Sequence, residues 1–492
     1  MIPPAVASGH PETTAAALSI LEAGGNAVDA CVAAGFTAAV AEPTLTSLAG
    51  GGFLLARMAD GEAVVFDFFV DTPGRGGTPP PEPDFAEVIV TFSGADQSFH
   101  VGAASVAVPG CLAGWLHAHR RLGRLPLADV VAPARRLAAD GVVVNDQQAY
   151  LLRILSPILT RTPEAAAIFA PGGSVPVRGD RLRNPDLAAF LDTLDDSGFD
   201  RPALASALAA AMERDGGLVT EADLAAYAVV ERAPLEVRWG RHHLLTNPPP
   251  ALGGELVALG LLLLEESDGW PAAPGSEAHV RHLVDAMVEA DDLRARGATS
   301  VELARRRSTG GTTHVSVSDG EGNVASMTTS NGEGSGWIIP GTGVMTNNML
   351  GEDDLHPDGF HAGPPGERVA SMMAPSLVVG DDGAVELVVG SGGSKRIRTA
   401  LLQVIAAVVD QGRSLDDAVT APRLHWDGAE VHAEPGWDPA ALAAGARGRP
   451  VRAWAQADLY FGGVHAVRPG REATGDPRRG GSSGLGFARR LT

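Results

Sequence analysis

A run of small residues, two threonines and a histidine occurs deep inside the chain, where "RSTGGTTHVSVSDGEGNVASMTTSNGEG" extends from Arg307 to Gly334. A threonine hydroxyl is a poor nucleophile at its own pKa. It becomes a good one when the free α-amino group of the same residue acts as the base. That amine has a pKa of about 8, which suits a base near neutral pH. Thr312 can work in this way only after the bond before it is cut.

Two glycines, Gly310 and Gly311, precede Thr312 and supply flexible, unhindered backbone for such a cut. Taken alone, the motif favours an ordinary strand residue, because threonine is common in strands. The elements around it decide how the threonine is placed. Val315 and Val317 alternate with serines, residues 319–323 form a turn, and residues 324–329 return. The pattern predicts a β-hairpin that begins at the threonine pair.

The rest of the chain supplies further strands and many helices. "SLVVGDDGAVELVVG" at 376–390 predicts a second strand pair, and a glycine turn after it leads into a helix. Helices are predicted at 12–23 and from Asn26 to about residue 41, with strands at 48–58 and 61–74 and a mostly helical region at 109–224. No linker or internal repeat separates these groups. We therefore expect one α+β domain whose sheets are covered by helices.

Composition excludes several classes of function. The chain has 492 residues and a formal net charge of −21, so its surface would repel a phosphate backbone and nucleic-acid binding is not expected. Its two cysteines, Cys31 and Cys111, lack the spacing of metal ligands and favour buried free thiols. His242 and His243 would face opposite sides of a strand. We expect no metal and no cofactor.

The N-terminus shows no basic region followed by an uninterrupted apolar run, so no signal peptide is indicated. No apolar run approaches the ~20 residues that a membrane-spanning helix needs. We expect a cytoplasmic protein that binds no membrane. A homo-oligomer is left open.

Many ordered motifs resemble the γ-glutamyltransferase (γ-glutamyl transpeptidase) family of N-terminal nucleophile hydrolases, over residues 6–423. They include "ILEAGGNAVDACVAAGF", "AGGGF", "ASVAVPGCLAGW", "DGGLVTEADLAAY", "NPPPALGG", "TTHVSVSDGEGNV", "GTGVMTNNM", "SMMAPSLVV" and "GSGGSKRI". The resemblance implies a four-layer αββα sandwich, one domain made of two chain segments. It implies a precursor that cuts itself at Gly311–Thr312, giving a large segment 1–311 and a small segment 312–492.

The resemblance also implies roles for individual residues. Thr312 matches the nucleophile for both self-cleavage and turnover. Ser330 matches a second hydroxyl residue that hydrogen-bonds the nucleophile; the alternative is an exposed turn serine. Gly392 and Gly393 match the pair whose backbone amides bind the oxyanion, and glycines do let amide groups approach a developing charge.

The chain departs from the family where the family binds the α-carboxylate of its substrate. Phe69 stands at the position of an arginine, and Met372 replaces one serine of a pair whose other member, Ser371, is kept. An arginine fork binds a carboxylate with two hydrogen bonds, and a phenylalanine gives none. The alternative is that Arg75 or Arg396 replaces the missing clamp.

Other substrate contacts are implied as retained. Glu352 or Asp353 matches the acidic residue that holds the substrate amine, and Asn331 matches a polar contact. We therefore expect a hydrolase or acyltransferase acting on a small amide-like or carbonyl substrate that is not a standard γ-glutamyl compound. One alternative is a carbon–carbon bond hydrolase in secondary-metabolite biosynthesis. The other is an unprocessed, non-enzymatic scaffold of the same fold.

Overall fold

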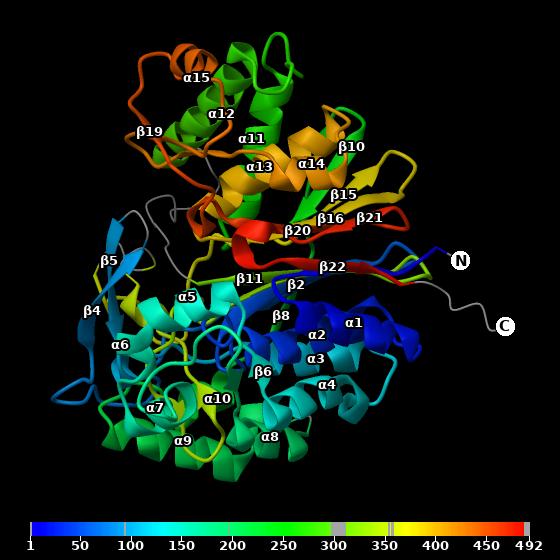
Figure 1. The fold of residues 1–492 in the computed structure, drawn as a ribbon. Coiled ribbons are helices and arrows are strands. Elements are labelled where there is room, and N and C mark those ends of the chain that lie inside the picture. The colour runs from blue at the N-terminus through cyan, green and yellow to red at the C-terminus, as the bar shows by residue number, and fades with distance from the viewer. Residues whose placement is uncertain are drawn as a thin grey trace.

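The computed structural model describes residues 2–92, 95–195, 197–296, 311–352, 355 and 359–486. Asp353 and Gly310 therefore lie outside the described residues. Two β-sheets lie face to face at the centre, and helices cover their outer faces (Figure 1). The predicted α+β class is confirmed by this arrangement.

The first sheet has seven strands and contains the predicted hairpin. Its strand order is β22 (Ser482–Leu485), β1 (Ala5–Ser8), β11 (Thr313–Ser318), β12 (Val324–Ser330), β2 (Gly51–Arg57), β3 (Ala63–Phe68) and β8 (Val230–Arg232). Strands β11 and β12 are antiparallel, with Thr313 opposite Thr329. This register places Ser330 beside the residues that precede β11.

The second sheet has six strands. Their order is β21 (Glu472–Thr474), β20 (Gly463–Arg468), β16 (Val385–Gly392), β15 (Ser376–Gly380), β10 (His242–Thr246) and β9 (Leu235–Trp239). The predicted strand pair at 376–390 is β15 and β16, and the helix after the glycine turn is α13 (Arg396–Val409).

Helices form the outer layers. Against the first sheet pack α1 (Pro11–Glu22), α2 (Ala27–Ala41) and α3 (Cys111–Leu122), and α4 (Leu127–Asp140) packs on α2. Against the second sheet pack α11 (Gly253–Glu265), α13 and α14 (Leu415–Thr420), while α12 (Glu277–Ala295) packs on α11 and α15 (Pro439–Gly445) packs on α12. Asn26 caps α2 with a capping box to Asp29, as the sequence predicts. Cys31 and Cys111 are buried free thiols, also as predicted.

The remaining elements surround the two sheets. They are β4 (Ala86–Phe92), β5 (Ala95–Val101), β6 (Val142–Val143), α5 (Asp146–Ile154), α6 (Ser156–Leu159), α7 (Pro163–Phe169), β7 (Arg181–Leu182), α8 (Pro185–Asp192), α9 (Pro202–Arg214), α10 (Glu221–Ala226), β13 (Ile338–Ile339), β14 (Val344–Met345), β17 (Leu424–Trp426), β18 (Val431–Ala433) and β19 (Val451–Ala453). Among the described residues, no helix is long and apolar enough to cross a membrane.

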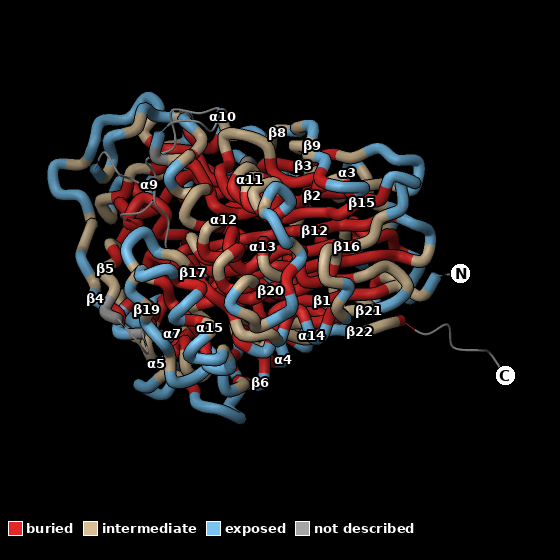
Figure 2. The backbone as a smooth tube through the Cα atoms, turned by 90° about the horizontal axis from the view of Figure 1, so that it is seen from above, coloured by how far each residue is buried: buried red, intermediate tan, exposed pale blue. Residues whose placement is uncertain are grey.

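The two sheets approach closely where β11 faces β16 and β20. Figure 2 shows that the chain is buried around β12, β16 and β20. A Cβ atom on Gly390 of β16 would lie 2.2 Å from the ring of His314 on β11. His314 is fully buried and hydrogen-bonds Thr328 (2.8 Å) and Ser316 (3.0 Å). Burial holds the pKa of His314 well below its usual value, so the ring is neutral and packs as part of the core.

The contact between Gly390 and His314 gives a test of the sheet packing. We expect Gly390→Val to lower the free energy of unfolding by roughly 1–3 kcal/mol, because the added methyl groups have no space between the sheets. Urea unfolding followed by circular dichroism measures this. Gly172→Val is the matched control, since no atom lies within 4 Å of a Cβ at that glycine. Equal midpoints for both variants would contradict the close approach.

Candidate active site

The peptide bond between Gly311 and Thr312 lies at the start of β11, between the two sheets. Thr312 has 4% of its surface exposed. The hydroxyl of Ser330 donates a short hydrogen bond to the carbonyl oxygen of Gly311 and accepts the amide N–H of Gly332 at 3.0 Å. These two bonds fix the orientation of the hydroxyl. Ser330 therefore polarises the carbonyl directly before Thr312, whereas the resemblance implies a bond to the nucleophile itself.

Arg479 holds the carbonyl on the other side of Thr312. Its Nη1 donates to the carbonyl oxygen of Thr312 at 3.2 Å. Burial lowers the pKa of Arg479 to about 10, so the guanidinium is still charged at neutral pH. No local motif singled out this residue in "DPRRGG", and the motifs of the resemblance end near Arg423.

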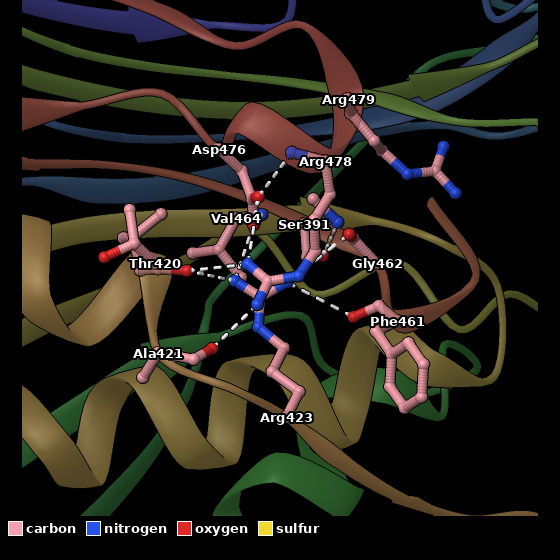
Figure 3. Close-up of polar contacts among 12 residues, drawn as sticks. Ser391, Thr420, Ala421, Arg423, Phe461, Gly462, Val464, Asp476, Arg478 and Arg479 are labelled. Carbon is pink, nitrogen blue, oxygen red and sulfur yellow. Dashed lines mark hydrogen bonds and ion pairs between the residues drawn. The ribbon is translucent and has the colours of Figure 1, made fainter. Parts of the chain in front are cut away.

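A buried ionic cluster fixes the segment that carries Arg479. Arg423 donates to Asp476 at 2.5 Å, and Arg478 contacts the other carboxylate oxygen of Asp476 at 3.2 Å. Arg478 also binds Glu434 at 2.6 Å. Figure 3 shows Arg423 and Arg478 meeting around Asp476, while the side chain of Arg479 points away from them. Arg479 is thus free of the cluster and directed toward Thr312.

The predicted oxyanion glycines lie next to Thr312. A Cβ atom on Gly392 would be 2.2 Å from the carbonyl oxygen of Thr312, so only glycine fits there. Gly393 has φ +123° and Ser394 has φ +55°, both in the left-handed region. This turn leads from β16 to α13 and brings Ser394 to the pocket beside Thr312. The oxyanion role of the glycines stays a prediction.

A small pocket lies beside Thr312. It brings together side chains that are far apart in the sequence, six of them predicted as site residues. Its lining residues are Phe69, Thr312, Ser330, Met349, Glu352, Leu355, Ser371, Met372, Met373, Ser394 and Ile397. Asn331 does not line it; its amide donates to the carbonyl of Thr346 at 3.4 Å. The prediction for Asp353 falls outside the described residues.

The small pocket offers no clamp for a carboxylate. No arginine lines it in the part of the chain that the structure describes, so neither Arg75 nor Arg396 takes the missing position. Arg368 lies behind Phe69, where it donates to the Phe69 carbonyl at 2.6 Å and pairs with Asp71 at 2.8 Å. Its guanidinium therefore supports the backbone of Phe69.

Two buried carboxyl groups near Thr312 were not predicted from the sequence. Glu42 accepts a hydrogen bond from the Thr313 hydroxyl at 3.0 Å, and burial raises its pKa to about 7. Glu333 has 5% of its surface exposed and interacts with the backbone amide of Gly311. Burial raises the pKa of Glu333 to about 8, against the opposing influence of nearby arginines. Glu333 lies between two glycines in the sequence, and this local pattern does not predict that its side chain is buried near Thr312.

A larger cavity, of about 240 Å³, adjoins the bond and is lined by Gly311. Asp427 and His432 also line it, and with Glu430 they form the one group of described side chains close enough together to hold a metal ion. His432 already contacts Asp427 at 3.0 Å and accepts from Trp454 at 3.2 Å. These bonds account for the arrangement without a metal.

Sequence and structure comparisons agree on one family. The family model for Gamma-glutamyltranspeptidase matches residues 13–305 and 293–485. The chain is 34% identical over 504 residues to an Acylase ACY 1 proenzyme of Pseudomonas sp. (strain SE83), covering 94% of this chain and 89% of the relative. It is 31% identical over 497 residues to a Glutathione hydrolase proenzyme of Escherichia coli (strain K12), covering 89% and 83%.

Among solved structures, cephalosporin acylase from Bacillus halodurans superposes with a TM-score of 0.79 at 25% identity. The superposition covers 98% of this chain and 95% of that one. The family model spans far more than half of the chain, and two enzymes exceed 30% identity over most of its length. This chain therefore belongs to the Gamma-glutamyltranspeptidase family of enzymes.

Proposed function

We propose that the chain is a self-processing N-terminal threonine hydrolase that acts on an amide-like or carbonyl substrate other than a γ-glutamyl compound. The observation that carries the proposal is the pair of fixed carbonyls around Thr312. Ser330 polarises the carbonyl of Gly311, and Arg479 holds the carbonyl of Thr312. Two relatives are named as proenzymes, which supports processing of this chain from a precursor.

Self-cleavage follows from this geometry. The Thr312 hydroxyl adds to the Gly311 carbonyl carbon, and the negative charge that develops on the oxygen is stabilised by Ser330. The C–N bond breaks, the nitrogen takes a proton, and an ester links Gly311 to the Thr312 oxygen. Water hydrolyses that ester. The products are the Gly311 carboxylate and a Thr312 with a free α-amine.

Turnover uses the same hydroxyl. The α-amine of Thr312 takes the hydroxyl proton as oxygen attacks the substrate carbonyl. We assign the oxyanion to the backbone amides of the Gly392–Gly393 turn, which adjoins Thr312. The leaving group departs with a proton, and water releases the acyl group from the ester.

The two proposed segments, 1–311 and 312–492, remain associated because each sheet contains strands of both. In the first sheet, β1 of the large segment pairs with both β11 and β22 of the small one. In the second sheet, β10 of the large segment pairs with β15 of the small one. Separation would break both sheets, so no linker is needed to hold the processed enzyme together.

The lining of the small pocket supports the proposed specificity. An unpaired carboxylate costs several kcal/mol to desolvate, and Phe69 and Met372 offer it apolar surface. Glu352 and Ser371 supply polar contacts in the same pocket. The combination suits an acyl group that is flatter or less charged than glutamate. An apolar pocket also suits a conjugated ketone, so carbon–carbon bond hydrolysis is a second candidate reaction.

The first prediction concerns the nucleophile. We expect Thr312→Ala to leave one uncut chain with no hydrolytic activity, because both reactions need this hydroxyl. Denaturing gels and intact mass measure the cut. Thr420→Ala is the control, because the Thr420 hydroxyl donates only to the carbonyl of Asp416. A cut at Gly311–Thr312 in the alanine variant would contradict a self-catalysed mechanism.

The second prediction concerns Ser330. We expect Ser330→Ala to slow self-cleavage by about 100-fold or more, because the scissile carbonyl loses its hydrogen-bond donor. Time courses of cell-free synthesis followed by gel electrophoresis give the rate. Ser326→Ala is the matched control: it lies on the same strand, is buried, and donates to the carbonyl of Val389 at 3.1 Å. Equal rates for the two variants would remove Ser330 from the reaction.

The third prediction concerns specificity. We expect the processed enzyme to show weak or absent activity on γ-glutamyl anilides and glutathione, because no arginine among the described residues lines the small pocket. Steady-state release of the aniline, on protein shown by gel to be fully cut, measures this. Transpeptidase-like efficiency would mean that another cation binds the carboxylate.

A further inference from the structure

Two cavities flank the Gly311–Thr312 bond. Thr312 lines the small pocket, and Gly311 lines the large cavity. These residues are neighbours in the chain, so the two cavities adjoin the bond for which we propose self-cleavage, and a substrate bound at Thr312 would lie between them.

One wall of the large cavity is a cluster of aromatic rings. Tyr460 stacks on Trp454 with ring centroids 4.7 Å apart and on His432 with centroids 5.0 Å apart, both at 25° between planes. The Arg396 guanidinium carbon lies 4.6 Å over the Tyr460 ring, and that of Arg452 lies 5.8 Å over Trp454. Aromatic and guanidinium planes of this kind bind flat conjugated groups well.

Aliphatic and amide side chains also line the cavity, among them Leu45, Leu151, Leu155 and Gln147. A planar ring that lies between aromatic and aliphatic side chains gains contact through both of its faces. The cavity has a volume of about 240 Å³.

Glu333 provides an independent sign that a ligand enters this cavity. It is buried and lines the cavity, and its Oε2 has no hydrogen-bond partner among the residues that the structure describes. Such an atom is costly to leave unsatisfied. In the uncut chain Glu333 interacts with the amide of Gly311, and departure of Gly311 removes that contact as well. A substrate N–H or O–H takes the vacated place.

We propose that the large cavity is the subsite for the leaving part of the substrate, and that it takes a flat, conjugated ring carrying a hydrogen-bond donor. This rests on the proposed function, since the subsite serves Thr312. The small pocket then holds the acyl group, and the aromatic cluster of Trp454, Tyr460 and His432 holds the ring.

The experiment uses two acetate esters whose leaving alcohols have similar acidity: 2-naphthyl acetate and hexafluoroisopropyl acetate. We expect processed protein to hydrolyse the naphthyl ester with a kcat/KM at least tenfold higher, after subtraction of the rate with Thr312→Ala. We expect Trp454→Ala to lower this ratio below threefold. Trp437→Ala is the matched control, a tryptophan that lines a different cavity, and it retains the ratio.

Gln147→Trp fills part of the large cavity without removing a packed ring. If Trp454→Ala does not fold, this variant tests in its place whether the naphthyl group binds in the cavity. The monoacetate of 2,6-dihydroxynaphthalene adds an O–H donor. We expect its kcat/KM to be a further threefold higher than that of 2-naphthyl acetate, and we expect Glu333→Leu to abolish this increase.

Equal kcat/KM for the naphthyl and fluoroalkyl esters, or an equal loss of the ratio in Trp437→Ala, would overturn the subsite while leaving the proposed function in place. Cut protein with no Thr312-dependent hydrolysis of either ester would overturn both.

Discussion

The two carbonyl groups that flank Thr312 are held from different parts of the molecule, and the site depends on this restraint. Ser330, at the end of β12, binds the carbonyl before the threonine. Arg479, which follows the second sheet in the chain, binds the carbonyl after it. A peptide whose two carbonyl groups are both hydrogen-bonded has few conformations left, which lowers the entropy cost of bringing the Thr312 hydroxyl to the neighbouring carbonyl. The proposed self-cleavage therefore depends on how the two sheets pack around Thr312.

Burying Arg479 beside Thr312 costs free energy, and the contacts of the neighbouring residues offset this cost. A fully buried arginine is expensive to desolvate, and its pKa is lowered accordingly. The adjoining segment is held by Asp476, whose carboxylate is shared by Arg423 and Arg478. The same region supplies the left-handed turn after β16, where Gly392 leaves room for the Thr312 carbonyl. The turn follows β16 of the second sheet, and Asp476 follows β21 of the same sheet. The proposed self-cleavage would therefore depend on a folded second sheet.

The local parts of this architecture follow from sequence patterns. Alternating valines and serines predict the hairpin of β11 and β12, and Asn26 predicts the start of α2, because both depend on neighbours in the chain. The meeting of Phe69, Ser371 and Met372 in one pocket depends on contacts between distant segments. It was predicted only through resemblance to a family, and the structure places all three in the pocket.

Other parts of the site could not be predicted in this way. Arg479 and Glu333 act through burial and through the partners that the fold gives them, and neither property is visible in a short stretch of sequence. The predicted hydrogen bond from Ser330 to the nucleophile stays a prediction, and the bond from Ser330 to the Gly311 carbonyl was not predicted, because a resemblance transfers a residue type and not every hydrogen bond. The large cavity arises where the β17–β19 region faces α5, and no motif marks it.

The central claim is that the folded chain cuts its own Gly311–Thr312 bond. The most direct test is the concentration dependence of the cut in freshly refolded, full-length protein, combined with N-terminal sequencing of the smaller product. The account predicts a first-order rate that does not change over a hundredfold range of protein concentration, and a product that begins at Thr312. A rate that rises with protein concentration, or a smaller product that begins at another residue, would contradict it.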